Sequence, residues 1–281
     1  MTAPVGLIAG LGQLPGEIAR SVRRRGGRVA AAALRELADA GLGDEVDELQ
    51  WVYLGELERT FGFFREVGVC DVVLAGKVPK TFLWLRPDAV RPDGRARTML
   101  SSLRDRSDDS MLGALARAIE AAGFALRGQG ELAPELWAGE GALGRLVPTA
   151  AQLEDVAFAW PVARALGGLD VGQTVVVQGK AVLALEAVEG TDEAIRRGCA
   201  LGQRGACVVK VAKPRQDPRF DVPAVGLDTV RTLAEGGGAV LAVEAGRTLL
   251  LQRGAMLAEA DARGVAVLGV SESTLRGAAP A

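Results

Sequence analysis

The sequence predicts an α/β protein built from two α/β domains, the first of them Rossmann-like, with a substrate cleft between them. Short apolar runs alternate with amphipathic helical segments in both halves of the chain, and glycines follow several of these runs. Periodicity is lost once, over residues 127–147, where glycine and proline accumulate. We therefore predict domains at residues 1–132 and 133–281.

The first element is an apolar run at Val5–Ala9, followed by a glycine turn and an amphipathic helix that ends near Gly26. A strand, a glycine turn and a helix in this order open many nucleotide-binding domains. The GxGxxG pattern is incomplete, because Pro15 follows Gly10 and Gly12 where the third glycine belongs. A nucleotide-binding turn and a plain tight turn both remain open.

A second buried strand is predicted at Asp71–Ala75, and it ends in the loop Gly76–Lys80. Ligands of open α/β sheets bind outside the carboxyl ends of the strands, so we place this loop on the same rim as the first glycine turn. Lys77 and Lys80 are candidates for phosphate contacts there, with solvated lysines as the alternative. The loop lacks the spacing of a Walker motif.

Ser107 precedes Asp108 and Asp109 at the start of a helix that stops at Gly123. Helix capping explains this pattern, because a serine cap and acids in the first turn suit the positive end of the helix. The alternative is that one of the two carboxylates points into the interdomain cleft.

The second half begins with a capping box at Thr149–Gln152. A hairpin follows, in which Gly179-Lys180 joins the strands Thr174–Gln178 and Ala181–Ala187. A short helix then runs to Gly198. The later elements are a strand at Cys207–Val211, two strands around Glu244–Arg247, a helix at Met256–Ala262 and a strand at Val265–Val270.

The loop Lys210–Gly226 combines alternating charge with three prolines, which rule out a continuous helix. Such a stiff, charged loop suits a site that holds a polyanion together with a hard cation. Its cations and acids belong to a wider set of charged residues at strand ends. The carboxylates of that set are Glu189, Asp192, Asp217, Asp221 and Glu244.

If the second domain forms one sheet, these carboxylates converge on one side of it. Carboxylates beside lysines and arginines suit phosphoryl transfer, where the acids hold Mg²⁺ and orient a water. The alternative is a set of surface salt bridges, each worth roughly 0–1 kcal/mol.

Composition narrows the chemistry further. The chain has no histidine, which excludes Ser-His-Asp triads, Cys-His pairs and histidine metal sites. An oxygen-only site favours magnesium, manganese or calcium. A net charge of −2 gives no reason to expect nucleic-acid binding. We read no signal peptide and no membrane span, and three widely spaced cysteines suit the cytoplasm.

Five stretches, in order, resemble the LpxI-type UDP-2,3-diacylglucosamine pyrophosphatases of lipid A biosynthesis, and the resemblance spans nearly the whole chain. These are GLIAGLGQLP (Gly6–Pro15), SDDSML (Ser107–Leu112), EAVEGTDEAI (Glu186–Ile195), VKVAKPRQDPRFDVPAVGLDT (Val209–Thr229) and EAG (Glu244–Gly246).

The resemblance implies Mg²⁺-dependent hydrolysis to UMP and 2,3-diacylglucosamine 1-phosphate, with water attacking the phosphorus nearer the sugar. It also implies that the lipid lies between the domains, which gives Phe82, Leu83 and Trp84 a role in an apolar cleft. Asp221 matches the aspartate thought essential in the family. Ser107 replaces the glycine of a family GDD motif, which brings Asp108 and Asp109 into the site.

The sequence thus nominates three sets of residues. Catalytic candidates are Asp221, Asp192 and Glu189; substrate-binding candidates are Gly10, Gly12, Gly76, Lys77, Lys210, Lys213, Arg219 and Thr191; Mg²⁺ ligands are Asp221, Asp217, Asp108 and Asp109.

The expected partner is a lipid-bearing UDP-sugar, and the expected location is the cytoplasm. Transient contact with the inner membrane surface and homodimer formation stay open. Two rival functions also remain. One is a Rossmann oxidoreductase, for which Glu36 or Asp39 would be the acid about 20 residues beyond the glycines. The other is a non-catalytic carrier of lipid or nucleotide.

Overall fold

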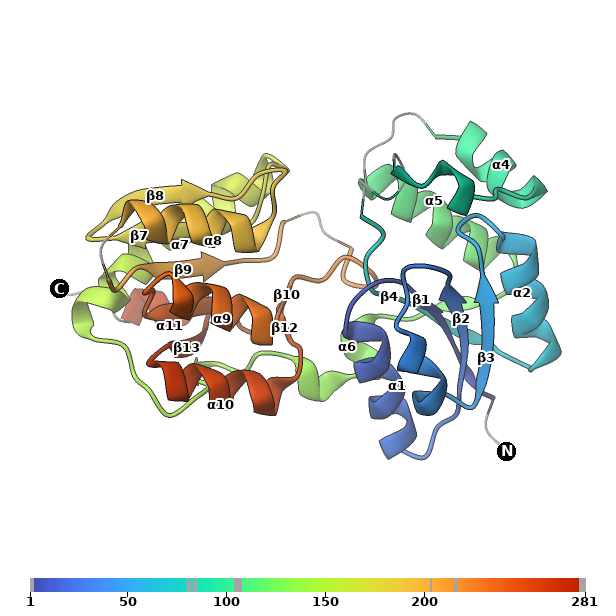
Figure 1. The fold of residues 1–281 in the computed structure, drawn as a ribbon, viewed down its shortest axis with the longest axis horizontal. Helices are drawn as coiled ribbons and strands as arrows, with labels where there is room; N and C mark the ends of the chain where they lie inside the picture. Colours follow the sequence, from blue (N-terminus) through green and yellow to red (C-terminus); the bar gives the residue numbers. More distant parts are fainter. Residues whose placement is uncertain are drawn as a thin grey trace. The chain divides into compact units, whose positions relative to one another are not determined.

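The computed structural model describes residues 3–79, 82, 85–103, 108–202, 204–214 and 217–277. The chain forms two compact units (Figure 1), and each unit contains its own central sheet. The first unit comprises Met1–Pro134 together with Asp217–Asp221, and the second comprises Glu135–Gln216 and Val222–Ala281. Two α/β units are therefore present, as the sequence predicts.

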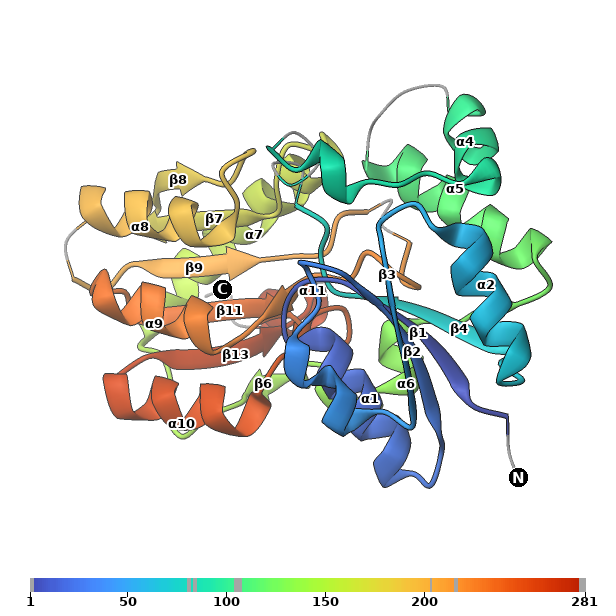
Figure 2. The ribbon, with the colours of Figure 1, turned by 45° about the vertical axis from the view of Figure 1, so that its right-hand side comes forward.

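The sheet of the first unit has five strands in the order β3-β2-β1-β4-β5 (Figure 2), and all neighbouring strands are parallel. The strands are β1 (Val5–Ala9), β2 (Val29–Leu34), β3 (Glu48–Val52), β4 (Asp71–Ala75) and β5 (Ala125–Leu126). This is the Rossmann strand order. The order in which the chain adds strands changes direction between β1 and β4, and ligands of such sheets bind at the carboxyl ends of the strands beside that point. The predicted Rossmann-like fold of the first domain is confirmed.

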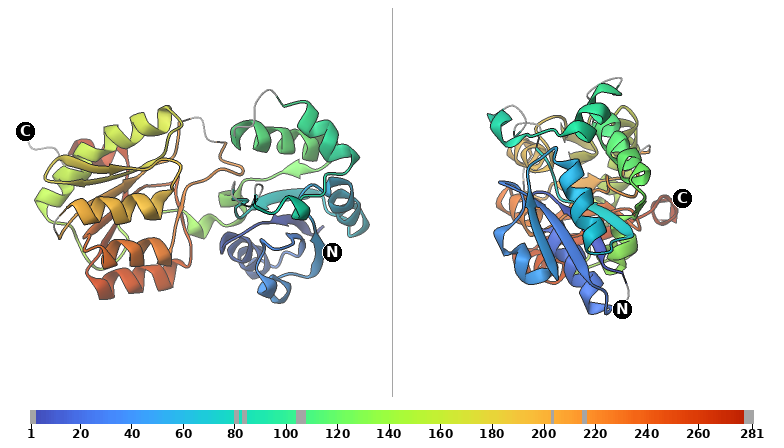
Figure 3. Two further views of the ribbon diagram at one scale, coloured as in Figure 1. Left: turned by 45° about the horizontal axis from the view of Figure 1, so that its top comes forward. Right: turned by 90° about the vertical axis from the view of Figure 1, so that its right-hand side faces the viewer.

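Helices cover both faces of this sheet. They are α1 (Leu14–Arg24), α2 (Leu57–Glu66), α4 (Gly94–Ser101), α5 (Asp108–Ala121) and the short α6 (Gln129–Leu132). Phe61 and Phe64 of α2 and Ile119 of α5 are completely buried against β2 and β4. The helices α1 and α5 lie on opposite sides of the strands (Figure 3). Pro15 in the first turn of α1 suits the fixed backbone angle of that position.

The second unit contains a six-stranded mixed sheet in the order β6-β13-β11-β9-β7-β8. Its central strands β9, β11 and β13 are parallel, whereas β6, β7 and β8 pair antiparallel to their neighbours. The strands are β6 (Gly141–Ala142), β7 (Thr174–Gln178), β8 (Ala181–Leu185), β9 (Cys207–Lys210), β11 (Val240–Glu244) and β13 (Ala266–Val270). A separate short pair is formed by β10 (Ala224–Val225) and β12 (Leu249–Leu250).

The helices of the second unit are α7 (Ala150–Gly168), α8 (Thr191–Leu201), α9 (Leu227–Glu235), α10 (Arg253–Arg263) and α11 (Glu272–Gly277). One face of the sheet packs against α8, α9 and α10 (Figure 1), and the other packs against α7 and α11. The predicted capping box is confirmed. The Thr149 hydroxyl accepts a hydrogen bond from the Gln152 N–H, and the Gln152 side chain accepts one from the Thr149 N–H. The predicted hairpin is confirmed too, since Gly179 and Lys180 have φ angles of +59° and +57°.

The bounds of some elements differ from the sequence prediction: β8 ends at Leu185 rather than Ala187, and β9 ends at Lys210 rather than Val211. The predicted helix Met256–Ala262 begins one turn earlier, at Arg253. Within the described residues, no helix is long and apolar enough to cross a membrane.

Candidate functional site

The carboxyl rim of the first sheet is built from backbone rather than from charged side chains. The N–H of Gly10 donates to the carbonyl of Ala75 at 2.8 Å, and Leu11 and Lys77 exchange two backbone hydrogen bonds of 2.9 and 2.8 Å. A Cβ on Gly76, whose φ is +88°, would lie 2.6 Å from the carbonyl carbon of Gly10. These loops approach each other closely only because glycine occupies both positions.

Gly12 behaves differently from its neighbours on the rim. Its φ is +104°, but a Cβ there would meet no atom within 4 Å. It lies just before α1, with open space beside it. Lys77 is exposed on the same rim. The predicted shared position of Gly10, Gly12, Gly76 and Lys77 is therefore confirmed, while their contact with substrate stays a prediction.

The segment Asp217–Asp221 packs within the first unit although it is distant in sequence. Its main anchor is Gln129, which is 3% exposed and donates from Nε2 to the carbonyls of Leu74 (2.9 Å) and Phe220 (3.1 Å). The ring of Phe220 packs against the core between the sheet and α2 and α5. Gln129 thus ties the carboxyl end of β4 to the residue that precedes Asp221.

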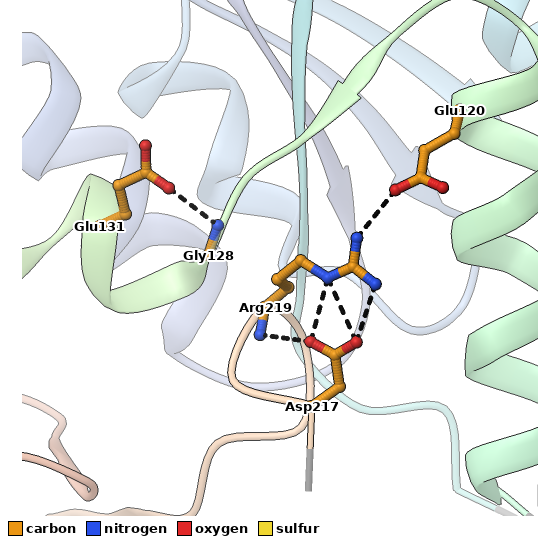
Figure 4. A network of polar contacts seen from close by, with 5 residues as sticks. All are labelled: Glu120, Gly128, Glu131, Asp217 and Arg219. Atoms are coloured by element: carbon orange, nitrogen blue, oxygen red, sulfur yellow. Dashed lines mark hydrogen bonds and ion pairs between the residues drawn. The ribbon is translucent and has the colours of Figure 1, made fainter.

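Asp217 and Arg219 of this segment bind one another (Figure 4). The guanidinium of Arg219 donates to both carboxylate oxygens of Asp217, with Nη2 at 2.8 Å from Oδ2 and Nε at 3.0 Å from Oδ1. Arg219 Nη1 reaches Glu120 of α5 at 2.8 Å. The hydrogen bonds from Arg219 hold the pKa of Asp217 below its ordinary value. Asp217, a predicted metal ligand, and Arg219, a predicted phosphate contact, therefore form an ion pair with each other.

Asp221 lies at the end of this turn and is partly buried. Its backbone N–H donates to the carbonyl of Asp217 at 3.0 Å, which fixes the turn that presents its side chain. The structure places Asp217, Arg219 and Asp221 on one short segment, anchored by Gln129 and Glu120. Sequence reasoning missed both anchors, because a glutamine and a glutamate in helices carry no pattern that reports a distant partner.

In the second unit, a buried polar chain lies where β9 ends and α8 begins. Lys210, only 6% exposed, donates to the hydroxyl of Thr191 and to the carbonyl of Ala224, both at 3.0 Å. The Thr191 hydroxyl donates to Oε1 of Glu186 at 2.9 Å, and Gln173 N–H donates to Oε2 at 3.2 Å. The structure thus brings together the predicted substrate-binding residues Lys210 and Thr191, and adds Glu186. The sequence signal that could have identified Glu186 was its position beside the EGTD stretch.

The other predicted acids of the second unit lie apart from this chain. Glu189 is exposed and forms an ion pair with Arg197, and both line an open depression of about 680 Å³. Hydrogen bonding to its own backbone N–H, and then to Arg197, lowers the pKa of Glu189. Asp192 lies in the first turn of α8, at the amino end of the helix. Lys213 pairs with Asp170 at 2.6 Å.

The five predicted strand-end carboxylates are distributed over both units, with Asp217 and Asp221 in the first and Glu189, Asp192 and Glu244 in the second. The described residues contain no group of three or more His, Cys, Asp or Glu side chains that could hold a metal ion. The remaining predicted residues lie outside what the structure describes. They are Lys80, Leu83, Trp84, Ser107 and the side chains of Asp108 and Asp109.

Comparisons with known proteins cover most of the chain. Residues 4–136 match a family model described as the LpxI N-terminal domain, and residues 139–268 match the LpxI C-terminal domain. The chain is 38% identical over 280 residues to the UDP-2,3-diacylglucosamine pyrophosphatase LpxI of Caulobacter vibrioides, covering 95% of this chain and 97% of that protein.

Among solved structures, a UDP-glucose-4-epimerase from Stenotrophomonas maltophila with bound NAD and formylated UDP-arabinopyranose has a TM-score of 0.29 and 14% identity. It covers 44% of this chain and 35% of that one, and we draw no conclusion from it. The two family models and the curated relative carry the assignment, and they confirm the resemblance seen in the sequence. The chain belongs to the LpxI family.

Proposed function

We propose that this protein hydrolyses UDP-2,3-diacylglucosamine to UMP and 2,3-diacylglucosamine 1-phosphate in lipid A biosynthesis. The observation that carries the proposal is 38% identity to a UDP-2,3-diacylglucosamine pyrophosphatase over 95% of this chain and 97% of that protein. Identity that extends over both units means that neither unit has been replaced by an unrelated one.

The structure supports the proposal at the residue level through Asp221. Its turn is held by Gln129 and by the Asp217–Arg219–Glu120 contacts. A catalytic carboxylate needs this kind of support, because small displacements of a reacting group are costly. We assign Asp221 the role of orienting water or holding the metal. We assign Lys210 and Thr191 to the substrate phosphates, since Lys210 supplies positive charge at a strand end.

We propose Mg²⁺ as the cofactor, and the donor set fits it in part. A chain without histidine offers oxygen ligands, which suit a hard cation. Mg²⁺ commonly uses only one or two carboxylates and takes its other ligands from phosphates and water. Asp217 does not fit in this conformation, because Arg219 binds both of its oxygens. Asp221 is our candidate ligand, and bound Mg²⁺ would neutralise charge on the diphosphate.

The other proposals follow from the same substrate. An enzyme that acts on a diacylated sugar must reach lipid, so we propose that it works in the cytoplasm with transient contact to the inner membrane surface. Formation of a homodimer remains a prediction. The rival oxidoreductase has less support, because Pro15 stands where the third glycine of the dinucleotide fingerprint belongs.

The test is release of UMP from UDP-2,3-diacylglucosamine by the full-length protein. We expect turnover with Mg²⁺, loss of turnover in EDTA, and recovery when excess Mg²⁺ is added back. Binding of the substrate without release of UMP would support the carrier instead, and turnover in EDTA equal to that with Mg²⁺ would contradict the metal requirement.

A further inference from the structure

Glu244 is a buried carboxylate at the carboxyl end of β11, a central strand of the second sheet. It is 7% exposed, and the backbone N–H of Ala212 donates to its Oε2 at 2.7 Å. Two arginines also bind it. Nη1 of Arg164, from α7, lies 3.4 Å from Oε1 and 3.3 Å from Oε2, and Nη1 of Arg247, from the turn after β11, lies 3.2 Å from Oε1.

Arg164 and Arg247 both contact Glu244 through Nη1, so the Nε–Nη2 edge of each guanidinium is not used in this contact. Across the described ranges of the chain, neither Nε nor Nη2 of Arg164 or Arg247 donates a hydrogen bond to a protein acceptor. The side chains are 34% and 42% exposed, so solvent reaches them. The Nε–Nη2 edge is a fork of parallel donors that matches two oxygens of a carboxylate or a phosphate.

Charge balance around Glu244 favours an anion. One carboxylate cannot neutralise two guanidinium groups, and Lys213 adds a third cation that is paired with Asp170. Lys213 directly follows Ala212, whose carbonyl accepts from Arg164 Nη1 at 3.2 Å. Two guanidinium groups therefore share one carboxylate at the carboxyl end of β11, which is the edge where α/β sheets bind ligands.

Preorganisation distinguishes this pair from ordinary surface arginines. A free arginine loses considerable rotamer freedom when it binds a ligand. Here the buried Glu244 already fixes both guanidinium groups, so less freedom remains to be lost. Since Glu244 is held by the Ala212 N–H, its position is set by the end of β9 as well as by β11.

We propose that Arg164 and Arg247, held by Glu244, form a binding site for a phosphoryl group. The identification of that group with the substrate rests on the proposed function: it is either the nucleotide-side phosphate or the sugar-side phosphate of the diphosphate. Both sources present the same chemistry, a tetrahedral phosphorus whose two non-bridging oxygens share a negative charge.

Isothermal titration calorimetry in EDTA at fixed ionic strength tests the site without turnover. The probes are inorganic pyrophosphate, UMP and glucosamine 1-phosphate, and the last two distinguish the nucleotide side from the sugar side. We expect Arg247→Gln and Arg164→Gln each to weaken binding of pyrophosphate about tenfold or more. Arg247→Lys keeps the charge but loses the fork, so we expect it to fall between wild type and Arg247→Gln.

The matched control is Arg231→Gln on α9 of the same unit. Arg231 is 45% exposed and pairs with Glu259 at 3.2 Å, so its removal changes net charge equally. We expect wild-type binding from this variant. Failure of wild type to bind any probe, wild-type affinity in both arginine variants, or equal weakening in Arg231→Gln would each overturn the site.

Two further measurements distinguish failure of the site from loss of the fold and from failure of the proposed function. Thermal unfolding checks the fold, and Arg247→Gln leaves Glu244 with Arg164 and the Ala212 N–H. UMP release by wild type reports on the proposed function separately. Pyrophosphate binding that depends on the arginines supports the site even if wild type releases no UMP. If wild type releases UMP while both variants keep its KM and its pyrophosphate affinity, the function stands and the site is wrong.

Discussion

In the first unit the carboxyl edge of the sheet is shaped by backbone, whereas in the second unit it is shaped by buried charged side chains. Gly10 and Gly76 let the loops after β1 and β4 come into hydrogen-bonding contact. In the second unit, Lys210, Glu186 and Glu244 occupy the corresponding edge and are all less than a tenth exposed.

The two edges would offer a ligand different kinds of contact. A backbone rim admits a ligand closely and offers N–H groups, while buried ionised side chains supply fixed charge in a setting where water screens it weakly. The segment Asp217–Asp221, which comes from the other half of the sequence, adds charged side chains to the first unit.

The largest effect on stability is expected where the first rim is tightest. An alanine at Gly76 would place its Cβ 2.6 Å from the backbone of Gly10 at a φ of +88°. We expect Gly76→Ala to lower the free energy of unfolding by about 3 kcal/mol. Gly12→Ala is the control, because it shares a positive φ but meets no atom within 4 Å, and we expect about 1 kcal/mol. Equal losses in urea unfolding would contradict the close-approach argument.

The second edge is tested by removing the charge of Glu244. Glu244→Gln keeps the shape but leaves two arginines without their shared counter-ion, and we expect a loss of about 2 kcal/mol. Glu259 also accepts from two arginines, Arg231 and Arg263, on the surface. Glu259→Gln should cost much less, because solvent screens its ion pairs. A cost for Glu244→Gln as small as this control would show that burial does not distinguish the second edge.

The smallest effect is expected from Asp217 and its pH dependence. Because Arg219 lowers the pKa of Asp217 in the folded state, the stabilisation is present above the ordinary unfolded value of about 3.9. It is lost as pH falls through the lower folded value. We expect Arg219→Gln to reduce stability at pH 6 by less than about 1 kcal/mol and to narrow its gap from wild type on acidification. A gap that stays constant down to pH 2 would contradict the assignment.

Local patterns were sufficient to predict much of the fold. Val5–Ala9 and Asp71–Ala75 were predicted with the bounds that the structure shows, because each is a short, mostly apolar run with a glycine directly after its last residue. The capping box at Thr149 and the hairpin at Gly179 were also correct, since both signals lie within four residues. The helix α10 began earlier than predicted because its first residues, Arg253 and Gly254, lack a starting signal.

The site was harder to predict because its contacts join residues far apart in sequence. Arg219 meets Glu120, and Gln129 meets Phe220, across about ninety to a hundred residues. Nothing in the alternating charges of Lys210–Gly226 indicated that part of this loop packs with the first unit. The contact of Arg164 with Glu244 was missed for the same reason, since Arg164 lies in an otherwise ordinary helix 80 residues away.

The central claim is that Asp221, which belongs to the first unit, is essential for the hydrolysis. The most direct measurement is the rate of UMP release from UDP-2,3-diacylglucosamine by Asp221→Asn, compared with wild type and with Asp228→Asn. Asp228 is a suitable control because its side chain is 91% exposed and lies seven residues further on. We expect kcat to fall about a thousandfold or more in Asp221→Asn, with the fold intact, and to stay near wild type in Asp228→Asn. Turnover of folded Asp221→Asn within a few-fold of wild type would contradict the claim.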